Sequence, residues 1–124
     1  MPVIPASDAP SFEIPGVRFT GLASPSRGAR ETSVWRLSMA PATEPLTHRL
    51  TREEIFVVLA GTGRFAIGAE KFDVAAGGAV IVPADTDFSL SNPHDRPLEA
   101  VAALPVGGRA RIGDAAPFTP PWAE

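Results

Sequence analysis

The spacing of proline and glycine along the chain limits its possible folds more than any other feature. The 124 residues include 14 Pro and 11 Gly, and one or the other interrupts almost every stretch that is long enough for a helix. Proline removes a backbone donor and clashes with the preceding helical turn. Short strands separated by turns are compatible with such spacing, so it favours an all-β domain.

The segments between these breaks have strand character. Residues 32–40 alternate, with Trp35, Leu37 and Met39 on one face, which is the pattern of a half-buried strand. The apolar run 55–60 (IFVVLA) predicts a strand that is covered on both faces. Other segments also have strand length, and about eight or nine short strands predict a sandwich or barrel. They are 12–22 (interrupted at Pro15-Gly16), 64–67, 71–74, 79–82, 88–91 and 98–104, with a turn expected at 61–63.

Length and composition indicate one domain and exclude several classes of protein. The chain has no Cys, which excludes disulfides and thiolate metal sites. A net charge of -3 with a single Lys argues against a nucleic-acid partner. No signal peptide and no membrane-spanning run is recognised, so we expect a cytoplasmic protein. We expect an N-terminal arm (1–11), a barrel domain (12–112) and a tail (113–124) that packs on the barrel or on a partner.

Two motifs of the chain resemble those of the cupin superfamily. The first family motif runs Gly, five residues, His, one, His, three or four, Glu, six, Gly; this chain matches it at His48, Glu54 and Gly61. The second runs Gly, five, Pro, one, Gly, two, His, three, Asn; this chain matches it at Gly77, Pro83 and Asn92. The resemblance covers residues 42–92 and implies a cupin double-stranded β-helix, a jelly-roll-like barrel.

The chain departs from both motifs at four positions. Ala42 and Asp85 occupy Gly positions, whereas Leu50 and Phe88 occupy His positions. In metal-binding cupins three His and one Glu hold iron, manganese, nickel or zinc. Tight sites normally take at least three protein ligands, so the resemblance here implies a degenerate metal site. We expect no cofactor, or a divalent metal at low occupancy.

The two remaining ligand positions, His48 and Glu54, are the candidate catalytic and metal-binding residues. They form either an acid–base pair or a buried, hydrogen-bonded remnant that fixes strand pairing. Burial would raise the pKa of the Glu54 carboxyl, and a nearby charged imidazole would lower it again. Leu50 and Phe56 are expected to line the same interior as His48 and Glu54, with Phe88 on the opposite wall, and the three together form an apolar ligand site.

Four charged residues allow two interpretations each. Arg36 and Arg64 lie on predicted strands; they would clamp a carboxylate ligand if they point inward and form surface salt bridges if they point outward. Asp85 and Asp87 flank a turn, where Asp is favoured for its hydrogen bonds to the backbone. Either Asp is otherwise a substitute metal ligand at the barrel mouth.

Three functions are compatible with these features. The first is a cupin that binds a small polar ligand in the barrel without a complete metal centre. The second is an enzyme of the isomerase, lyase or dioxygenase type that acts on a small sugar or carboxylate with a degenerate or metal-free site. The third is a subunit that uses the barrel to dimerise. A homodimer is expected because Ile55, Val57 and Leu59 point outward if Phe56 and Val58 point inward.

Overall fold

The computed structural model describes residues 3–124, which form an all-β domain. Within this range the only helical segments are three 3-10 turns of three residues each, and none is long and apolar enough to cross a membrane. The fold class expected from the proline and glycine spacing is confirmed. The elements in chain order are η1 (Ala6–Asp8), β1 (Ser11–Ile14), β2 (Val17–Ala23), η2 (Pro25–Arg27), β3 (Thr32–Met39), β4 (Arg49–Leu50), β5 (Glu54–Ala60), β6 (Thr62–Ile67), β7 (Glu70–Ala75), β8 (Ala79–Val82), β9 (Phe88–Ser91), β10 (Leu98–Pro105), β11 (Ala110–Arg111) and η3 (Pro121–Ala123).

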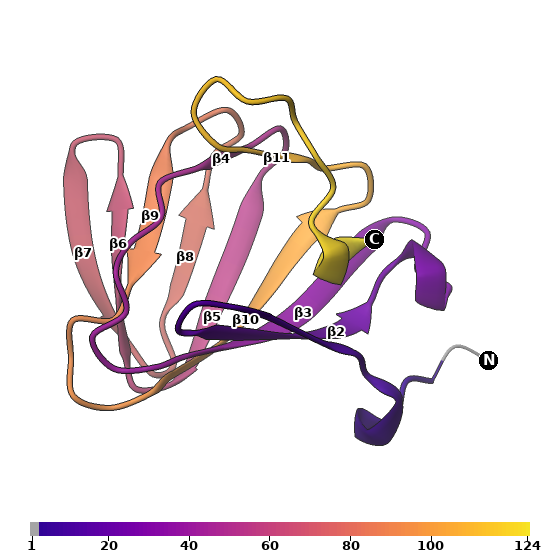
Figure 1. Ribbon diagram of the computed structural model, residues 1–124, viewed down its shortest axis with the longest axis horizontal. Coiled ribbons are helices and arrows are strands. Elements are labelled where there is room, and N and C mark those ends of the chain that lie inside the picture. Colours follow the sequence, from indigo (N-terminus) through magenta and orange to yellow (C-terminus); the bar gives the residue numbers. More distant parts are fainter. Residues whose placement is uncertain (1–2) are drawn as a thin grey trace.

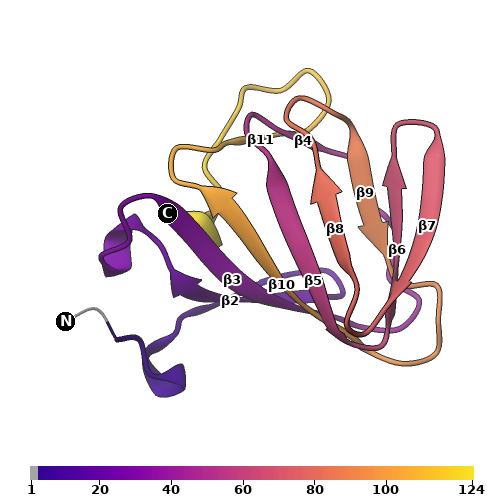
Figure 2. The same cartoon turned by 180° about the vertical axis from the view of Figure 1, so that it is seen from behind.

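The strands form three antiparallel sheets. The largest has the order β1-β2-β3-β10-β5-β8, the second β7-β6-β9, and β11 pairs with β4 in a two-stranded sheet. Figures 1 and 2 show the two larger sheets curving around a common interior, with β4 and β11 across one end. Strands of two residues carry no periodic signal, and for this reason the sequence does not predict β4 and β11.

Alternation along the strands separates the core from the surface. On β3, Trp35, Leu37 and Met39 are buried, as the period of two predicts. On β10 every second residue from Leu98 to Leu104 is buried, and two of them are alanines. The core therefore lies between the two larger sheets.

Strand β5 is apolar on both faces but is covered on only one. Phe56 and Val58 are buried inside the barrel, whereas Ile55, Val57 and Leu59 remain 37–46% exposed on the outside. The expectation of a strand covered on both faces is wrong for this chain. The three-stranded sheet covers the inner side of β5, and no segment of residues 3–124 buries its outer side.

A single glycine carries the chain from one sheet into the other. Gly61 separates β5 from β6 and has φ 75°, and a Cβ there would lie 2.3 Å from the carbonyl oxygen of Pro97. The turn is shorter than the predicted 61–63, because Thr62 and Gly63 already belong to β6. The close approach explains why glycine is needed at this position.

The hairpin of β1 and β2 extends the large sheet, and the C-terminal tail packs on it. Residues 12–22 form the hairpin of β1 and β2, with Pro15-Gly16 as its turn. Near the other end, the Trp122 ring stacks on Phe19 with centroids 3.6 Å apart. The Ser33 hydroxyl donates to the carbonyl of Ala123 at 3.0 Å. These contacts fix the tail against β2 and β3.

The uncovered outer face of the large sheet extends over four strands. One row across β3, β10, β5 and β8 contains only apolar side chains: Val34, Ala103, Ile55 and Ile81. The charged residues on this face of β3 and β10 are Arg36 and Glu99, which pair with each other at 3.2 Å. The face thus presents apolar surface to water without an unbalanced charge that would repel a like surface.

We predict that a second copy of the chain covers this face. Strand spacing and rise give four strands an area of roughly 20 Å by 20 Å, or about 800 Å² over both subunits, which is below the standard size of a stable interface and fits a weak dimer. Sedimentation at tens of micromolar should give twice the chain mass of 13.0 kDa. Ile81→Glu should give monomers, because Ile81 is 61% exposed on this face.

Ile112→Glu is the matched control, since Ile112 is 40% exposed but lies outside the face. It should leave the dimer intact. A monomeric wild type, or equal loss of the dimer in both variants, would contradict the prediction.

Candidate functional site

The structure places His48 directly beside Phe88. The His48 N–H donates to the Phe88 carbonyl at 2.9 Å, the Phe88 N–H donates to the His48 carbonyl at 2.8 Å, and the ring centroids are 4.4 Å apart. The sequence interpretation put Phe88 on the wall opposite His48, and this is wrong for His48, although Phe88 does face Phe56 of β5 from the other sheet. The segment before β4 runs antiparallel to β9, so the two motif positions are neighbours in one sheet.

Aromatic rings fill the interior next to this pair. The Phe56 ring lies 5.9 Å from Phe88 and 5.3 Å from Phe65, both in edge-on geometry. Leu50 is 3% exposed and Phe65 is fully buried. Sequence reasoning missed Phe65, although its place in the short alternating segment 64–67 was a usable signal. The side chains of Leu50 and Phe88 therefore fill the space that two imidazoles would occupy in a complete motif.

Glu54 begins β5 and is buried in this apolar interior. Its side chain is 3% exposed, and its buried Oε1 has no hydrogen-bond partner within residues 3–124. Burial raises the pKa of the Glu54 carboxyl to about 8, because an apolar environment disfavours the charged form. At pH 7 the carboxyl is accordingly protonated and neutral.

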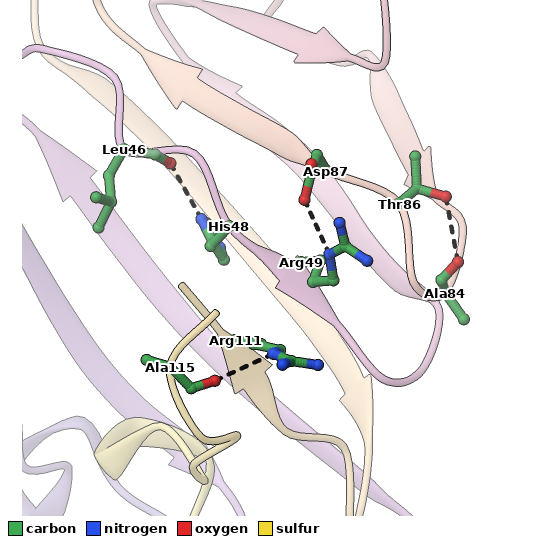
Figure 3. A network of polar contacts seen from close by, with 8 residues as sticks. All are labelled: Leu46, His48, Arg49, Ala84, Thr86, Asp87, Arg111 and Ala115. Carbon is green, nitrogen blue, oxygen red and sulfur yellow. Dashed lines mark hydrogen bonds and ion pairs between the residues drawn. The ribbon is translucent and has the colours of Figure 1, made fainter. Parts of the chain in front are cut away.

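His48 is half-buried, and its ring is held by a backbone carbonyl. Nδ1 lies 3.1 Å from the Leu46 oxygen (Figure 3); since a carbonyl can only accept, Nδ1 carries the proton and Nε2 is an acceptor. Burial lowers the pKa of His48 below 6.5, and the bond to Leu46 offsets part of this effect. The imidazole is neutral at pH 7. In the described chain no hydrogen bond joins the side chains of His48 and Glu54.

The residues present do not fit the metal centre that complete cupin motifs imply. Within residues 3–124 no three His, Cys, Asp or Glu side chains come together in a group suited to a metal ion. Asp87 pairs with Arg49 at 2.9 Å instead (Figure 3), and Asp85 is exposed on its turn. One neutral imidazole and one protonated carboxyl are a poor donor set for a divalent cation.

Arg36 and Arg64 both point away from the interior. Arg36 pairs with Glu99 at 3.2 Å and Arg64 with Asp73 at 2.9 Å, and both guanidinium groups are about half exposed. The sequence allows either an inward carboxylate clamp or a surface salt bridge, and in the structure both arginines form surface salt bridges. Their strand positions place them on the outer faces of two different sheets.

Backbone conformation supports the alignment of the two motifs. Ala42 has φ 58° and Asp85 has φ 55°, and within residues 3–124 they are the only residues other than glycine with positive φ. Both occupy motif positions where complete cupin motifs have Gly, the residue that adopts this conformation at least cost. The turns of the motif are retained although the glycines are not.

Two antiparallel sheets around a closed interior, with motif remnants on adjacent strands, define a cupin-type barrel. The family model described as "Cupin domain" matches residues 35–104. The chain belongs to this family. No curated protein sequence matches the chain.

Several solved structures are similar to this one. The polyketide cyclase RemF from Streptomyces resistomycificus has a TM-score of 0.80 at 14% identity, covering 94% of this chain and 87% of that one. A predicted oxalate decarboxylase from Thermotoga maritima has 0.71 at 21% identity, covering 84% and 98%. Salicylate 1,2-dioxygenase from Pseudoaminobacter salicylatoxidans, as an adduct with gentisate, has 0.70 at 15% identity, covering 86% and 31%. At these identities the likeness shows the fold.

We predict that the buried Glu54 makes stability depend on pH. Its folded pKa of about 8 lies above the ordinary 4.5, so between these values the folded state binds more protons than the unfolded state. The stabilisation that this proton uptake provides is complete below pH 4.5 and is lost as the pH rises to about 8. Over this range the free energy of unfolding falls by up to ~1.4 kcal/mol per pH unit. Glu54→Gln should remove this fall in urea denaturation curves measured from pH 5 to 9.

The exposed Glu13 gives the matched control. Glu13→Gln should retain the wild-type pH profile. If Glu54→Gln shows the same slope as wild type, the carboxyl is not the group responsible.

A second prediction concerns the lost ligand positions. The double change Leu50→His, Phe88→His should create tight Zn²⁺ or Ni²⁺ binding that neither single change gives, because it restores three imidazoles beside Glu54. Without metal the variant should be less stable, since replacing buried Leu or Phe typically costs ~2–5 kcal/mol, less where imidazole refills the space. Metal at a thousandfold excess over its dissociation constant should restore roughly 4 kcal/mol in a thermal-shift titration.

Adding His48→Ala to the double variant is the control and should abolish the metal-dependent shift. A folded double variant that shows no shift with any of Zn²⁺, Ni²⁺, Mn²⁺ and Fe²⁺ would mean that these positions do not converge.

Proposed function

We propose that this protein binds a small, uncharged polar ligand inside the barrel, beside His48 and Glu54, without a complete metal centre. The observation that carries the proposal is the buried Oε1 of Glu54, which lacks a hydrogen-bond partner within residues 3–124. An unsatisfied buried polar atom costs roughly 1–3 kcal/mol. A ligand that forms a hydrogen bond there removes this penalty, and binding gains from it.

The chemistry of the two polar groups limits the ligand. The raised pKa of Glu54 and the lowered pKa of His48 leave both groups neutral near pH 7. Neither group offsets the desolvation of a charged ligand, which favours an uncharged one. The protonated carboxyl donates to a carbonyl or hydroxyl oxygen, and Nε2 of His48 accepts from a hydroxyl. Leu50, Phe56 and Phe88 supply apolar contact for the rest of the molecule, as is common in ligand sites.

An enzymatic role is the alternative, and the same two groups favour it. At pH 7 Glu54 holds a proton and His48 lacks one on Nε2, which is the state that a general acid and a general base need. Isomerase and lyase reactions on a small sugar or carboxylate proceed through such proton transfers. The similar structures include a polyketide cyclase and a predicted decarboxylase, which shows that this fold is used by enzymes.

We predict that ligand binding depends on the Glu54 proton. Screening neutral sugars, ketones and phenols by thermal shift should give a ligand whose affinity falls at least tenfold in Glu54→Leu, because a donor in a dry site is lost. Its affinity should also fall above pH 8. Glu53→Leu is the matched control, since Glu53 is the exposed neighbour in sequence, and it should bind as wild type.

A ligand bound equally by both variants at every pH would overturn the proposal. An enzyme is distinguished from a binder by Glu54→Gln, which should keep affinity but lose turnover.

The absence of nucleic-acid and membrane partners and the cytoplasmic location remain predictions from the sequence.

A further inference from the structure

A second place for a small molecule lies outside the barrel, on the outer face of the sheet β7-β6-β9. It is a hollow of about 420 Å³ between this sheet and the segment that precedes β4. Figure 1 shows this segment running along the sheet on the side away from β5. The residues that the argument uses are Glu44, Arg64, Ala66, Lys71, Ser89 and Ser91.

The hollow exists because the covering segment pairs with β9 only at its ends. Thr43 pairs with Asn92 and His48 with Phe88, so residues 44–47 stand opposite only three residues of β9. Pro45 has no N–H to donate to the strand. The extra residue makes the segment bulge away from β9, as extra residues do in paired strands.

The floor of the hollow carries two hydroxyls without protein partners. Ser89 and Ser91 are 8% and 9% exposed, and no other group within residues 3–124 forms a hydrogen bond with either hydroxyl. The register places Ala66 between Ser89 and Lys71, and its short side chain leaves open space above the sheet at this point. Buried hydroxyls are normally hydrogen-bonded, so these two are available to a ligand.

Two cations stand at the side of the same hollow. Nε and Nη2 of Arg64 donate to the Asp73 carboxylate at 2.9 and 3.1 Å. These bonds lower the pKa of Asp73 and orient the guanidinium, with Nη1 left free of any hydrogen bond in the described chain. Lys71, the only lysine, forms no ion pair within residues 3–124. One cation is therefore fixed in place and the other is free to close on an anion.

Another surface hollow provides a contrast. It measures about 620 Å³ and lies along β1, β2 and β3. Its cations are neutralised, since Arg18 pairs with Glu13 at 2.8 Å and Arg36 with Glu99 at 3.2 Å. Ser38 also donates to Glu99. Both hollows contain arginine, but only the one on the three-stranded sheet combines an unpaired cation with free hydroxyls.

We propose that the hollow on the three-stranded sheet binds a small hydroxylated carboxylate, that is, a hydroxy acid or sugar acid. The carboxylate lies between Arg64 and Lys71, where charge-assisted hydrogen bonds are strongest. Ser89 and Ser91 bind hydroxyls of the ligand, and Glu44 on the covering segment accepts from another. The site is independent of His48 and Glu54, which lie on the other side of the sheet.

The test is a titration of the full chain, followed by amide NMR shifts, with sodium gluconate, glycerate and lactate. Two compounds serve as control ligands at matched ionic strength: glucose, which lacks the carboxylate, and acetate, which lacks the hydroxyls. At least one hydroxy acid should give saturable shifts at residues 66, 89 and 91 and none at Glu54. Lys71→Met should weaken this binding about tenfold, and Ala66→Phe, which fills the floor, should abolish it.

Arg18→Met is the matched control, because it removes the same charge from the neutralised hollow; it should leave affinity unchanged. If Ala66→Phe does not fold, Ser89→Ala/Ser91→Ala takes its place and should weaken binding at least fivefold. The proposal is overturned if no hydroxy acid saturates, if acetate binds equally well, or if Arg18→Met weakens binding as much as Lys71→Met does.

Discussion

The closed barrel depends on the crossing of the chain at Gly61. Strand β5 belongs to the six-stranded sheet and β6 to the three-stranded sheet, with one residue between them. The positive φ of Gly61 and the Pro97 carbonyl beneath it leave no room for a side chain. Because the chain bends here, Phe56 of β5 meets Phe65 of β6 across the interior. Together with the later crossings from β7 to β8, from β8 to β9 and from β9 to β10, this one holds the two sheets face to face.

The filled interior in turn sets the chemistry of the site. Leu50 and Phe88 occupy positions where metal-binding cupins have imidazoles, so Glu54 is surrounded by hydrocarbon. Its raised pKa is a consequence of that environment, just as the lowered pKa of His48 is. Complete cupin motifs favour a cation at this place, whereas here both polar groups are neutral and lie in an apolar interior; the proposed uncharged ligand follows from that difference.

The outer faces of the barrel differ from its interior and from each other. The large sheet presents apolar side chains such as Ile81, whereas the three-stranded sheet presents Arg64, Lys71 and two serines beneath a bulging segment. Strand alternation sends neighbouring residues to opposite faces, so Ser89 lies outside while Phe88 lies inside. One short strand thus contributes to both proposed sites.

The sequence by itself determined the fold class, most strand positions and the two cupin motifs, because periodicity and spacing are local properties. It placed Ala42 and Asp85 at the motif turns, where the backbone has the expected conformation. Only the tertiary structure decided that Phe88 lies beside His48 and that Arg64 points outward to Asp73, on the face that carries Ser89 and Ser91. Periodicity tells which residues share a face, but which strands become neighbours depends on pairing between distant segments. The burial that neutralises Glu54 is likewise a property of the assembled barrel.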